Sequence, residues 1–402
     1  MSKPKIRFKG YEEDWEQRKL GEVAKYRRGS FPQPYGNKEW YGGDGAMPFV
    51  QVADVTDEMN LVTDTKLKIS KKAQPMSVYA EKNSVLVTLQ GSIGRVAITQ
   101  YGAFVDRTVL IFEEYNEQID NAFWAYIIKQ KFIEEARKAP GGTIKTITKE
   151  ALSGFDLTLP SYDEQVKLGI YFQSLDSLIT LHQRKCDEVK SLKKYMLQKM
   201  FPQNEQKVPE IRFEGFTEAW EQRKLGDVAE FSKGSGYSKG DLVEYGTPII
   251  LYGRLYTNYE TRISDVDTFV EAKVGSVYSK GGEVIVPASG ETAEDIARAA
   301  TVDKSGILLG GDLNIVMPNK DINSSFLAIS ISSGNPQREL AKKAQGKSVV
   351  HIHNEEIKNL VLPFPIKDEQ NKIASYFCQL DNLITLHQRK VSSRLFLNKS
   401  TI

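Results

Sequence analysis

Apolar positions recur every three to four residues along one stretch of the chain, from Asp163 to Phe201. A spacing that averages 3.5 residues is typical of a helix that packs along a single stripe against another helix. At about 1.5 Å of rise per residue, this helix is expected to be about 50–60 Å long. The predicted stripe consists of Leu168, Phe172, Leu175, Ile179, His182, Cys186 and Val189.

The same pattern returns 205 positions later, where Asp368 takes the place of Asp163. SLITLHQRK, which begins at Ser177, and NLITLHQRK, which begins at Asn382, differ only in their first residue. A helix with one apolar stripe needs a partner, so we predict that the two copies pack on each other as an intramolecular coiled coil. The second stripe consists of Ile373, Phe377, Leu380, Ile384, His387 and Val391.

The duplication extends beyond the helices. WEQRKLG occurs in both halves, from Trp15 and from Trp220, at the end of a linker-like arm whose tryptophan is expected to anchor it in the core. Before each long helix, the apolar positions of Gly141–Pro160 match those of Gly346–Pro365. Each half therefore consists of an arm, a domain and a long helix, and the predicted boundaries are 1–160, 161–201, 202–365 and 366–402.

Between these shared segments the two halves have almost no identical residues. β-rich runs bounded by turn residues predict strands in both halves: Pro48–Val55, Ser84–Leu89, Ala103–Phe112, Pro248–Tyr256, Gly282–Ser289 and Leu313–Pro318. A helix is predicted over 121–139, and a weaker one near Phe326 that is broken at Gly334. The fold class is therefore α+β, with two mixed α/β domains and two long helices. A chain whose two halves share the arm and the long helix but differ in the segment between them is expected to recognise two different ligands.

Composition narrows the class of protein further. The 402 residues carry a net charge of +2, so any nucleic-acid binding must come from local features. No apolar run reaches the roughly 18 residues of a membrane span, and no signal peptide follows Met1, so we expect a cytoplasmic protein without a membrane partner. Cys186 and Cys378 occupy non-equivalent positions and form neither a disulfide framework nor a metal-spaced cluster.

The shared motifs resemble the specificity subunit of type I restriction–modification systems over essentially the whole chain. The resemblance is carried by the arm that ends in WEQRKLG, by the segment that ends at Pro160 or Pro365, and by the LITLHQRK helix. It implies two target-recognition domains, each of which reads one half of a split duplex DNA sequence. It also implies that the long helices are antiparallel and set the spacer between the two halves.

The same resemblance implies a subunit without catalytic activity or a cofactor of its own. Its expected partners are double-stranded DNA, two methyltransferase subunits that use S-adenosylmethionine to methylate adenine and, in the full complex, two restriction subunits that use ATP and Mg²⁺. The sequence contains neither the phosphate-binding loop nor the methyltransferase tetrad that such catalysis requires.

Three pairs of loops are candidates for DNA contact. Arginine can fork onto guanine edges or phosphates, and glycine lets the backbone approach DNA closely. The first pair follows the WEQRKLG segments and supplies Arg27, Arg28, Ser30 and Tyr35 in one half and Lys233, Ser235, Tyr237 and Lys239 in the other. The alternative for this pair is a solvated turn with scattered charge.

The second pair consists of Gln90, Ser92 and Arg95, with Ser289 in the looser counterpart, where a structural glycine-rich hairpin is the alternative. Arg107 either contacts DNA or is buried against Asp106. The third pair supplies Thr143 and Lys145, with Lys347, Ser348 and His351, and a simple turn into the next helix is the alternative.

Two motifs suggest other chemistry, which we do not favour. Gly236–Gly240 spells the GxSxG pattern around Ser238, but no strand-then-helix context surrounds it. His351 and His353 have no third metal ligand nearby in the sequence, so we predict no metal site. Two rival functions remain: a bivalent protein scaffold that does not read DNA, consistent with the near-neutral charge, and a hydrolase acting through Ser238.

Overall fold

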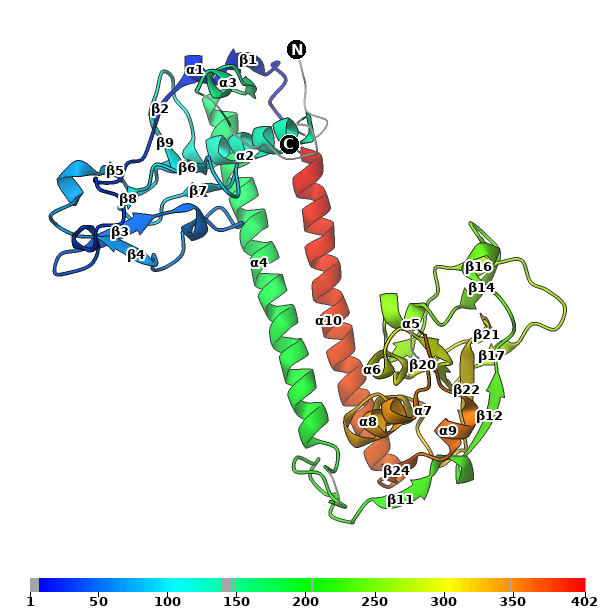
Figure 1. Ribbon diagram of the computed structural model, residues 1–402. Helices are drawn as coiled ribbons and strands as arrows, with labels where there is room; N and C mark the ends of the chain where they lie inside the picture. The colour runs from blue at the N-terminus through cyan, green and yellow to red at the C-terminus, as the bar shows by residue number, and fades with distance from the viewer. Residues whose placement is uncertain (1–6, 139–146, 148, 204–205, 347–348, 402) are drawn as a thin grey trace. The chain divides into compact units, whose positions relative to one another are not determined.

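The computed structural model describes residues 7–138, 147, 149–203, 206–346 and 349–401 (Figure 1). The chain forms two compact units, and the divisions between them fall inside the two long helices. The first unit comprises Met1–His182 with Lys390–Ile402, and the second comprises Gln183–Arg389. Each unit has a mixed α/β core of its own, as the fold-class prediction requires. Along the described residues, no helix is both long and apolar enough to cross a membrane.

The first unit is built from layers. One four-stranded sheet has the order β2-β9-β6-β7 and the other has the order β4-β3-β8-β5. The strands are β2 (Ala24–Arg28), β3 (Met47–Val50), β4 (Leu67–Ile69), β5 (Val78–Ala80), β6 (Val85–Thr88), β7 (Val96–Ile98), β8 (Ala103–Val105) and β9 (Val109–Tyr115). The short helices are α1 (Leu20–Val23), α3 (Lys149–Ser153), η1 (Lys38–Trp40), η2 (Val52–Asp54) and η3 (Gln74–Met76).

Helix α2 (Asn121–Lys138) covers one face of the first sheet, and the second sheet covers the other face (Figure 1). The alternation along β6 shows why: Val85 and Val87 point into the cluster that contains α2, while Leu86 points into the cluster between the sheets. Successive strand residues face opposite sides, so a strand buried on both faces is continuously apolar.

The second unit repeats these layers with five-stranded sheets, whose orders are β12-β22-β18-β20-β15 and β13-β16-β14-β21-β17. The strands are β12 (Ala229–Lys233), β13 (Leu242–Val243), β14 (Thr247–Ile250), β15 (Arg262–Ile263), β16 (Phe269–Val270), β17 (Tyr278–Lys280), β18 (Glu283–Pro287), β20 (Ala300–Val302), β21 (Ser305–Leu309) and β22 (Leu313–Pro318). A small sheet pairs β19 (Ser289–Gly290) with β23 (Val350–His351). The short helices are α5 (Arg254–Thr257), α6 (Ala293–Ile296), α7 (Ser324–Ile331), α8 (Gly334–Lys343), α9 (Asn354–Lys358), η5 (Leu225–Asp227) and η6 (Lys239–Asp241).

The arm of each half, expected to be linker-like, contains a strand. EQRK forms β1 (Glu16–Lys19), which pairs antiparallel with β10 (Asp156–Leu159), and it forms β11 (Glu221–Lys224), which pairs with β24 (Val361–Phe364). The register is the same in both units. Four consecutive polar residues carry no strand pattern, so only the partner strand from the far end of the same unit orders them. Trp220 is fully buried beside this strand, as expected for an anchor, whereas the equivalent Trp15 is half-buried and packs against the core of the first unit.

The two long helices are α4 (Tyr162–Lys199) and α10 (Lys367–Thr401). In the second unit they pack antiparallel, because the contacts advance along α4 as they retreat along α10: the Cys186 Sγ lies 4.0 Å from the Ile384 carbonyl oxygen, and Lys193 pairs with Asp381. Every residue of both predicted stripes is buried or half-buried. The predicted fold class is confirmed.

The stripe has two kinds of partner, which periodicity could not reveal. Leu168, Phe172 and Leu175 belong to the core of the first unit, where α2 packs against them. The corresponding residues of α10 belong to the core of the second unit together with Trp220. The first part of each long helix is therefore the base on which its own domain is built.

Four predicted elements differ from those observed. The strand expected over 103–112 is interrupted at 106–108, so that β8 and β9 lie in different sheets. The strands expected from Pro48 and from Pro248 end at Val50 and at Ile250, and the short helices η2 and α5 follow them. The helix near Phe326 is two helices, and Gly334-Asn335-Pro336 opens α8 instead of ending α7. Proline is tolerated there because amides of the first helical turn have no partner within the helix.

Candidate nucleic-acid interface

Both units carry a Gly-Ser pair at equivalent positions. Gly29-Ser30 directly follows β2, and Gly234-Ser235 directly follows β12. The serine amide donates to the Val105 carbonyl in the first unit and to the Leu309 carbonyl in the second, at 2.9 Å in both. The backbone that carries the predicted DNA-contacting loops is thus positioned in the same way twice.

The glycine of each pair is required by a close backbone approach. A Cβ built on Gly29 would lie 2.2 Å from the Val105 carbonyl oxygen, and one built on Gly234 would lie 1.9 Å from the Gly310 carbonyl oxygen. The serine of each pair is also used internally. The Ser30 hydroxyl accepts the Val78 amide at 3.0 Å, and the Ser235 hydroxyl accepts an amide at 3.1 Å. Both serines hold the frame together.

Replacing Gly234 with alanine is expected to destabilise the second unit by about 1–3 kcal/mol, because the new methyl group meets backbone that must shift. Gly253→Ala in the same unit is the matched control, since Gly253 has an ordinary helical φ of −59° and open space around its Cβ position. Urea unfolding of both variants measures the difference. Equal stability of the two would contradict the close approach.

Arg27 and Arg28, which the sequence placed in the first loop, are the last two residues of β2, and both side chains already have partners. The Arg27 Nε lies 2.5 Å from the Glu113 Oε1, and an Arg28 Nη donates to the Ile147 carbonyl at 3.5 Å. Tyr35 is 63% exposed and is the freest side chain of this group.

In the counterpart loop, Lys233 and Lys239 are exposed, but Tyr237 is only 8% exposed. Its hydroxyl accepts the Lys273 amide at 2.7 Å and bonds with the Ser276 hydroxyl at 2.5 Å. Tyr237 therefore braces the 273–276 turn, and its ring does not face solvent.

The second predicted pair of loops behaves differently in the two units. Gln90 and Ser92 are exposed on the turn between β6 and β7, whereas the Arg95 Nε pairs with an Asp57 carboxylate oxygen at 2.9 Å. In the second unit, Ser289 is buried and its hydroxyl lies 3.1 Å from the His351 Nδ1. The structure thus brings together Ser289 and His351, which the sequence placed in separate loops. Thr143, Lys145, Lys347 and Ser348 lie outside the described residues.

Arg107 lies in the interruption between β8 and β9 and is exposed. The alternative in which it is buried against Asp106 is wrong, because the Asp106 carboxylate bonds to the Thr108 amide and hydroxyl at 3.0 and 2.6 Å. The guanidinium of Arg107 instead lies over the ring of Phe31, 4.8 Å from its centroid. Sequence reasoning missed this stacking, since Phe31 and Arg107 are far apart in the chain.

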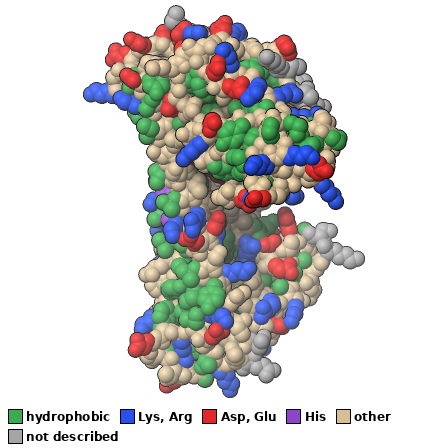
Figure 2. Space-filling view, turned by 90° about the vertical axis from the view of Figure 1, so that its left-hand side faces the viewer, with side chains coloured by type: hydrophobic (Ala, Val, Ile, Leu, Met, Phe, Trp, Pro, Cys, Tyr) green, Lys and Arg blue, Asp and Glu red, His purple; other side chains and the backbone are tan. Residues whose placement is uncertain are grey.

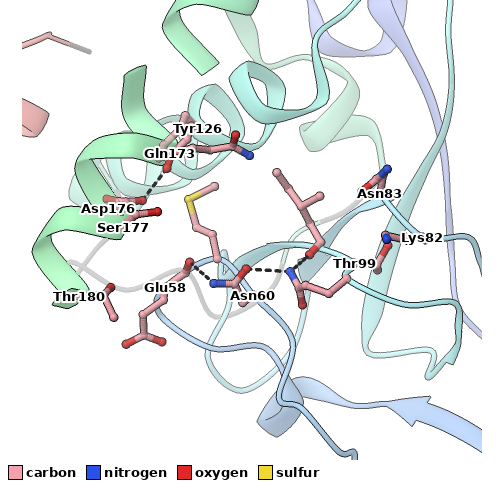
Figure 3. A pocket seen from close by; sticks show the side chains of 13 residues that line it. Glu58, Asn60, Lys82, Asn83, Thr99, Tyr126, Gln173, Asp176, Ser177 and Thr180 are labelled. Carbon is pink, nitrogen blue, oxygen red and sulfur yellow. Dashed lines mark hydrogen bonds between the residues drawn. The ribbon is translucent and has the colours of Figure 1, made fainter. Parts of the chain in front are cut away.

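A cavity of about 630 Å³ opens in the first unit between the α4 helix and the loops around Asn60, Asn83 and Gln100 (Figure 3). On its helical wall, the Tyr126 hydroxyl donates to Asp176 at 2.6 Å. Burial raises the pKa of Tyr126 above its ordinary value, and the bond to Asp176 adds to the rise, so the phenol stays a neutral donor. The lining carries Glu58 and Asp176 but only one lysine, so it does not attract phosphate.

The surface charge is mixed. On the face shown in Figure 2, lysine and arginine side chains are interspersed with aspartate and glutamate. This agrees with the net charge of +2 over the whole chain. Binding to a nucleic acid would therefore depend on particular side chains and not on a broad positive field.

The hydrolase alternative receives no support from the geometry around Ser238. Its hydroxyl donates to the Asp241 carboxylate at 2.9 Å and caps η6. The hydrogen bond from Lys273 lowers the pKa of Asp241 to about 2, and bonds from the Ser238 amide and hydroxyl contribute to the shift. A carboxylate with so low a pKa is a poor general base at neutral pH, so it does not activate a nucleophile.

Metal binding by the histidine pair is equally unsupported. The His351 ring bonds to Ser289, and His353 is the residue before α9, where its amide donates to Glu356 at 2.8 Å. Within the described ranges, no three histidine, cysteine or acidic side chains gather into a site that could hold a metal ion.

Comparisons with known proteins agree with the repeated frame. The family model described as the type I restriction modification DNA specificity domain matches twice, at residues 12–191 and 217–394. The MjaVIII specificity subunit of a type I restriction enzyme from Methanocaldococcus jannaschii is 22% identical over 393 residues, which cover 94% of this chain and 88% of that protein. The MjaIX specificity subunit from the same organism is 22% identical over 237 residues, which cover 55% of this chain and 53% of that protein.

Among solved structures, the S subunit of a type I restriction–modification system from M. genitalium superposes with a TM-score of 0.65. The alignment covers 100% of this chain and 98% of that chain at 15% sequence identity. At this level of identity the likeness concerns the fold.

Proposed function

This chain belongs to the family of type I restriction–modification DNA specificity subunits, and from that premise we propose that it reads a split duplex DNA sequence, one half with each unit. One observation carries the proposal. The backbone of the Gly-Ser pair makes the same hydrogen bonds in both units, while the side chains of the loops that follow it differ. A protein that binds one ligand twice would keep both surfaces alike, whereas a reader of two different half-sites would not.

The proposed subunit performs no chemistry itself. Its partners would be two methyltransferase subunits, which use S-adenosylmethionine to methylate adenine in the target, and restriction subunits that use ATP and Mg²⁺. The chain's own contribution would be to bind and to orient: the loops would contact the DNA, and the long helices would set the spacer between the two half-sites, as the family resemblance implies. We expect this to take place in the cytoplasm.

Exchange of one insert tests the division of labour. Replacing residues 29–140 with the corresponding insert of another specificity subunit is expected to change one half of the recognised sequence and to leave the other half and the spacer unchanged. Mapping of methylated adenines across a genome, in cells that express the methyltransferase subunits with either chain, measures both halves at once. A change in both halves would contradict independent readers.

The scaffold alternative makes a different prediction from the same complex. It is favoured by the mixed surface charge, which gives DNA no general attraction. The complex with methyltransferase subunits can be tested on random duplexes and on duplexes that contain the sequence identified by methylation mapping. Equal affinity for both would support the scaffold function and contradict sequence-specific DNA recognition.

A further inference from the structure

The loop between β8 and β9 presents a single cation on an aromatic support. The Arg107 guanidinium lies 4.8 Å from the centroid of the Phe31 ring, and the Phe31 and Tyr35 rings lie edge to face with their centroids 4.6 Å apart. Arg107 and Tyr35 are both exposed. A guanidinium over a ring face is attracted to it and loses rotamer freedom before any ligand arrives.

The acidic neighbour of Arg107 does not neutralise it. Asp106 is 3% exposed, its amide donates to the Val50 carbonyl at 2.9 Å, and its carboxylate is taken by Thr108. Within the described residues, no carboxylate forms an ion pair with Arg107, whereas Arg27 and Arg95 of the same unit pair with Glu113 and Asp57. The loop thus turns its negative group inward and leaves the guanidinium edge available to a ligand.

The second unit has the same loop with different side chains. The Gly234 amide donates to the Leu313 carbonyl just as the Gly29 amide donates to the Val109 carbonyl, at 3.1 and 2.9 Å. Between these matched anchors the sequence Asp-Arg-Thr of the first unit is replaced by Gly310-Gly311-Asp312.

The aromatic support is also missing in the second unit. Gly236 stands where Phe31 follows the Gly-Ser pair, and a Cβ built on Gly311 would lie 3.3 Å from the Gly236 Cα. The cation and its ring are therefore replaced together. Paired replacement on an unchanged frame is the pattern expected at a position that decides which bases are read.

We propose that Arg107, held on the ring of Phe31, reads a guanine in the half-site bound by the first unit. The inference rests on the proposed function. It adds that Arg107 contacts the base, that this base is guanine, and that Phe31 positions the arginine. The planar fork of donors matches the O6 and N7 acceptors of guanine in the major groove, which is the commonest specific arginine contact. The same fork also fits a phosphate, but a phosphate contact carries no sequence information and would be expected in both units, whereas this cation is absent from the equivalent loop of the second unit.

The test uses the full chain in complex with its methyltransferase subunits and a library of duplexes randomised across the target. Arg107→Ala and Arg107→Lys are both expected to lose about 5- to 150-fold of the preference for one G·C pair in one half-site. Lysine keeps the charge and loses the fork. Phe31→Leu is expected to weaken the same preference by about 2- to 5-fold, since it keeps the apolar contact and removes the ring face.

Arg18→Ala is the matched control, because this arginine of the same unit lies in β1, outside the candidate loops, and pairs with Glu16 at 3.3 Å, and it is expected to leave the preference unchanged. Melting temperatures of all variants check that the first unit stays folded. Uniformly weaker binding by Arg107→Ala, with an unchanged sequence preference and a shallower salt dependence, would assign Arg107 to a phosphate and overturn the inference alone. A wild-type complex without any sequence preference would overturn the proposed function, and this inference with it.

Discussion

Replacement of Arg212 by methionine is expected to destabilise the second unit by about 3–5 kcal/mol. The Arg212 Nε and one Nη donate to the two oxygens of Glu369 at 2.7 and 2.8 Å, and Glu369 is 0% exposed at the start of α10. Without the guanidinium, an ionised carboxylate would be left in the core, and that desolvation is costly. Urea unfolding, with amide exchange to assign the loss to the second unit, measures the effect.

The duplication supplies matched controls for this prediction. Arg7 binds Glu164 through the same two atoms at 2.7 Å each, so Arg7→Met is expected to destabilise the first unit by a similar amount and to spare the second. The double variant Arg212→Met with Glu369→Gln is expected to recover part of the loss, since it removes the stranded charge. A loss below about 1 kcal/mol in Arg212→Met would show that the pair does not hold the arm to α10.

Truncation of Phe377 to alanine is expected to destabilise the second unit by about 3–5 kcal/mol. The Phe377 side chain is fully buried in the core that contains Trp220, and its ring centroid lies 6.2 Å from that of Phe201. Removal of the ring leaves a cavity between the two long helices and the domain, which surrounding side chains fill only in part. Chemical denaturation of the full chain measures the loss.

Leu386→Ala on the same helix is the control for Phe377→Ala. Leu386 is 45% exposed and lies off the predicted stripe, so its truncation is expected to change the free energy of unfolding by no more than about 0.5 kcal/mol. Similar losses in both variants would mean that the buried face of α10 is not the one given by the 3.5-residue period.

The duplication and the two long helices could be predicted because both follow from local sequence patterns that repeat along the chain. The stripe from Leu168 to Val189 specifies a helix and its buried face, and its recurrence at Ile373 specifies a second helix. The same duplication placed both Gly-Ser pairs at matching positions. Periodicity and repetition need no knowledge of distant contacts.

The sequence did not indicate all of the elements that these helices and strands pack against. The stripe correctly predicted burial, but it did not indicate that Phe172 packs against the domain core of its own unit. Likewise, the polar EQRK segments became strands only because β10 and β24 offer them an edge. Their strand conformation depends on tertiary pairing and not on propensity.

The candidate site shows this limit most clearly. From sequence, Ser30, Tyr237 and Arg107 were all candidates for DNA contact. The structure commits the Ser30 hydroxyl to the Val78 amide, buries Tyr237 beneath a turn, and leaves Arg107 exposed on Phe31. In each case the decisive neighbour lies more than thirty positions away in the chain.

By itself, then, the sequence determined the duplication, the two long helices with their buried stripes, and the family. Only the tertiary structure decided which loop side chains support the frame and which are presented to a ligand. The physical reason is that a helix face follows from periodic spacing along one segment, whereas the exposure of a side chain in a short loop depends on the backbone that folding brings against it.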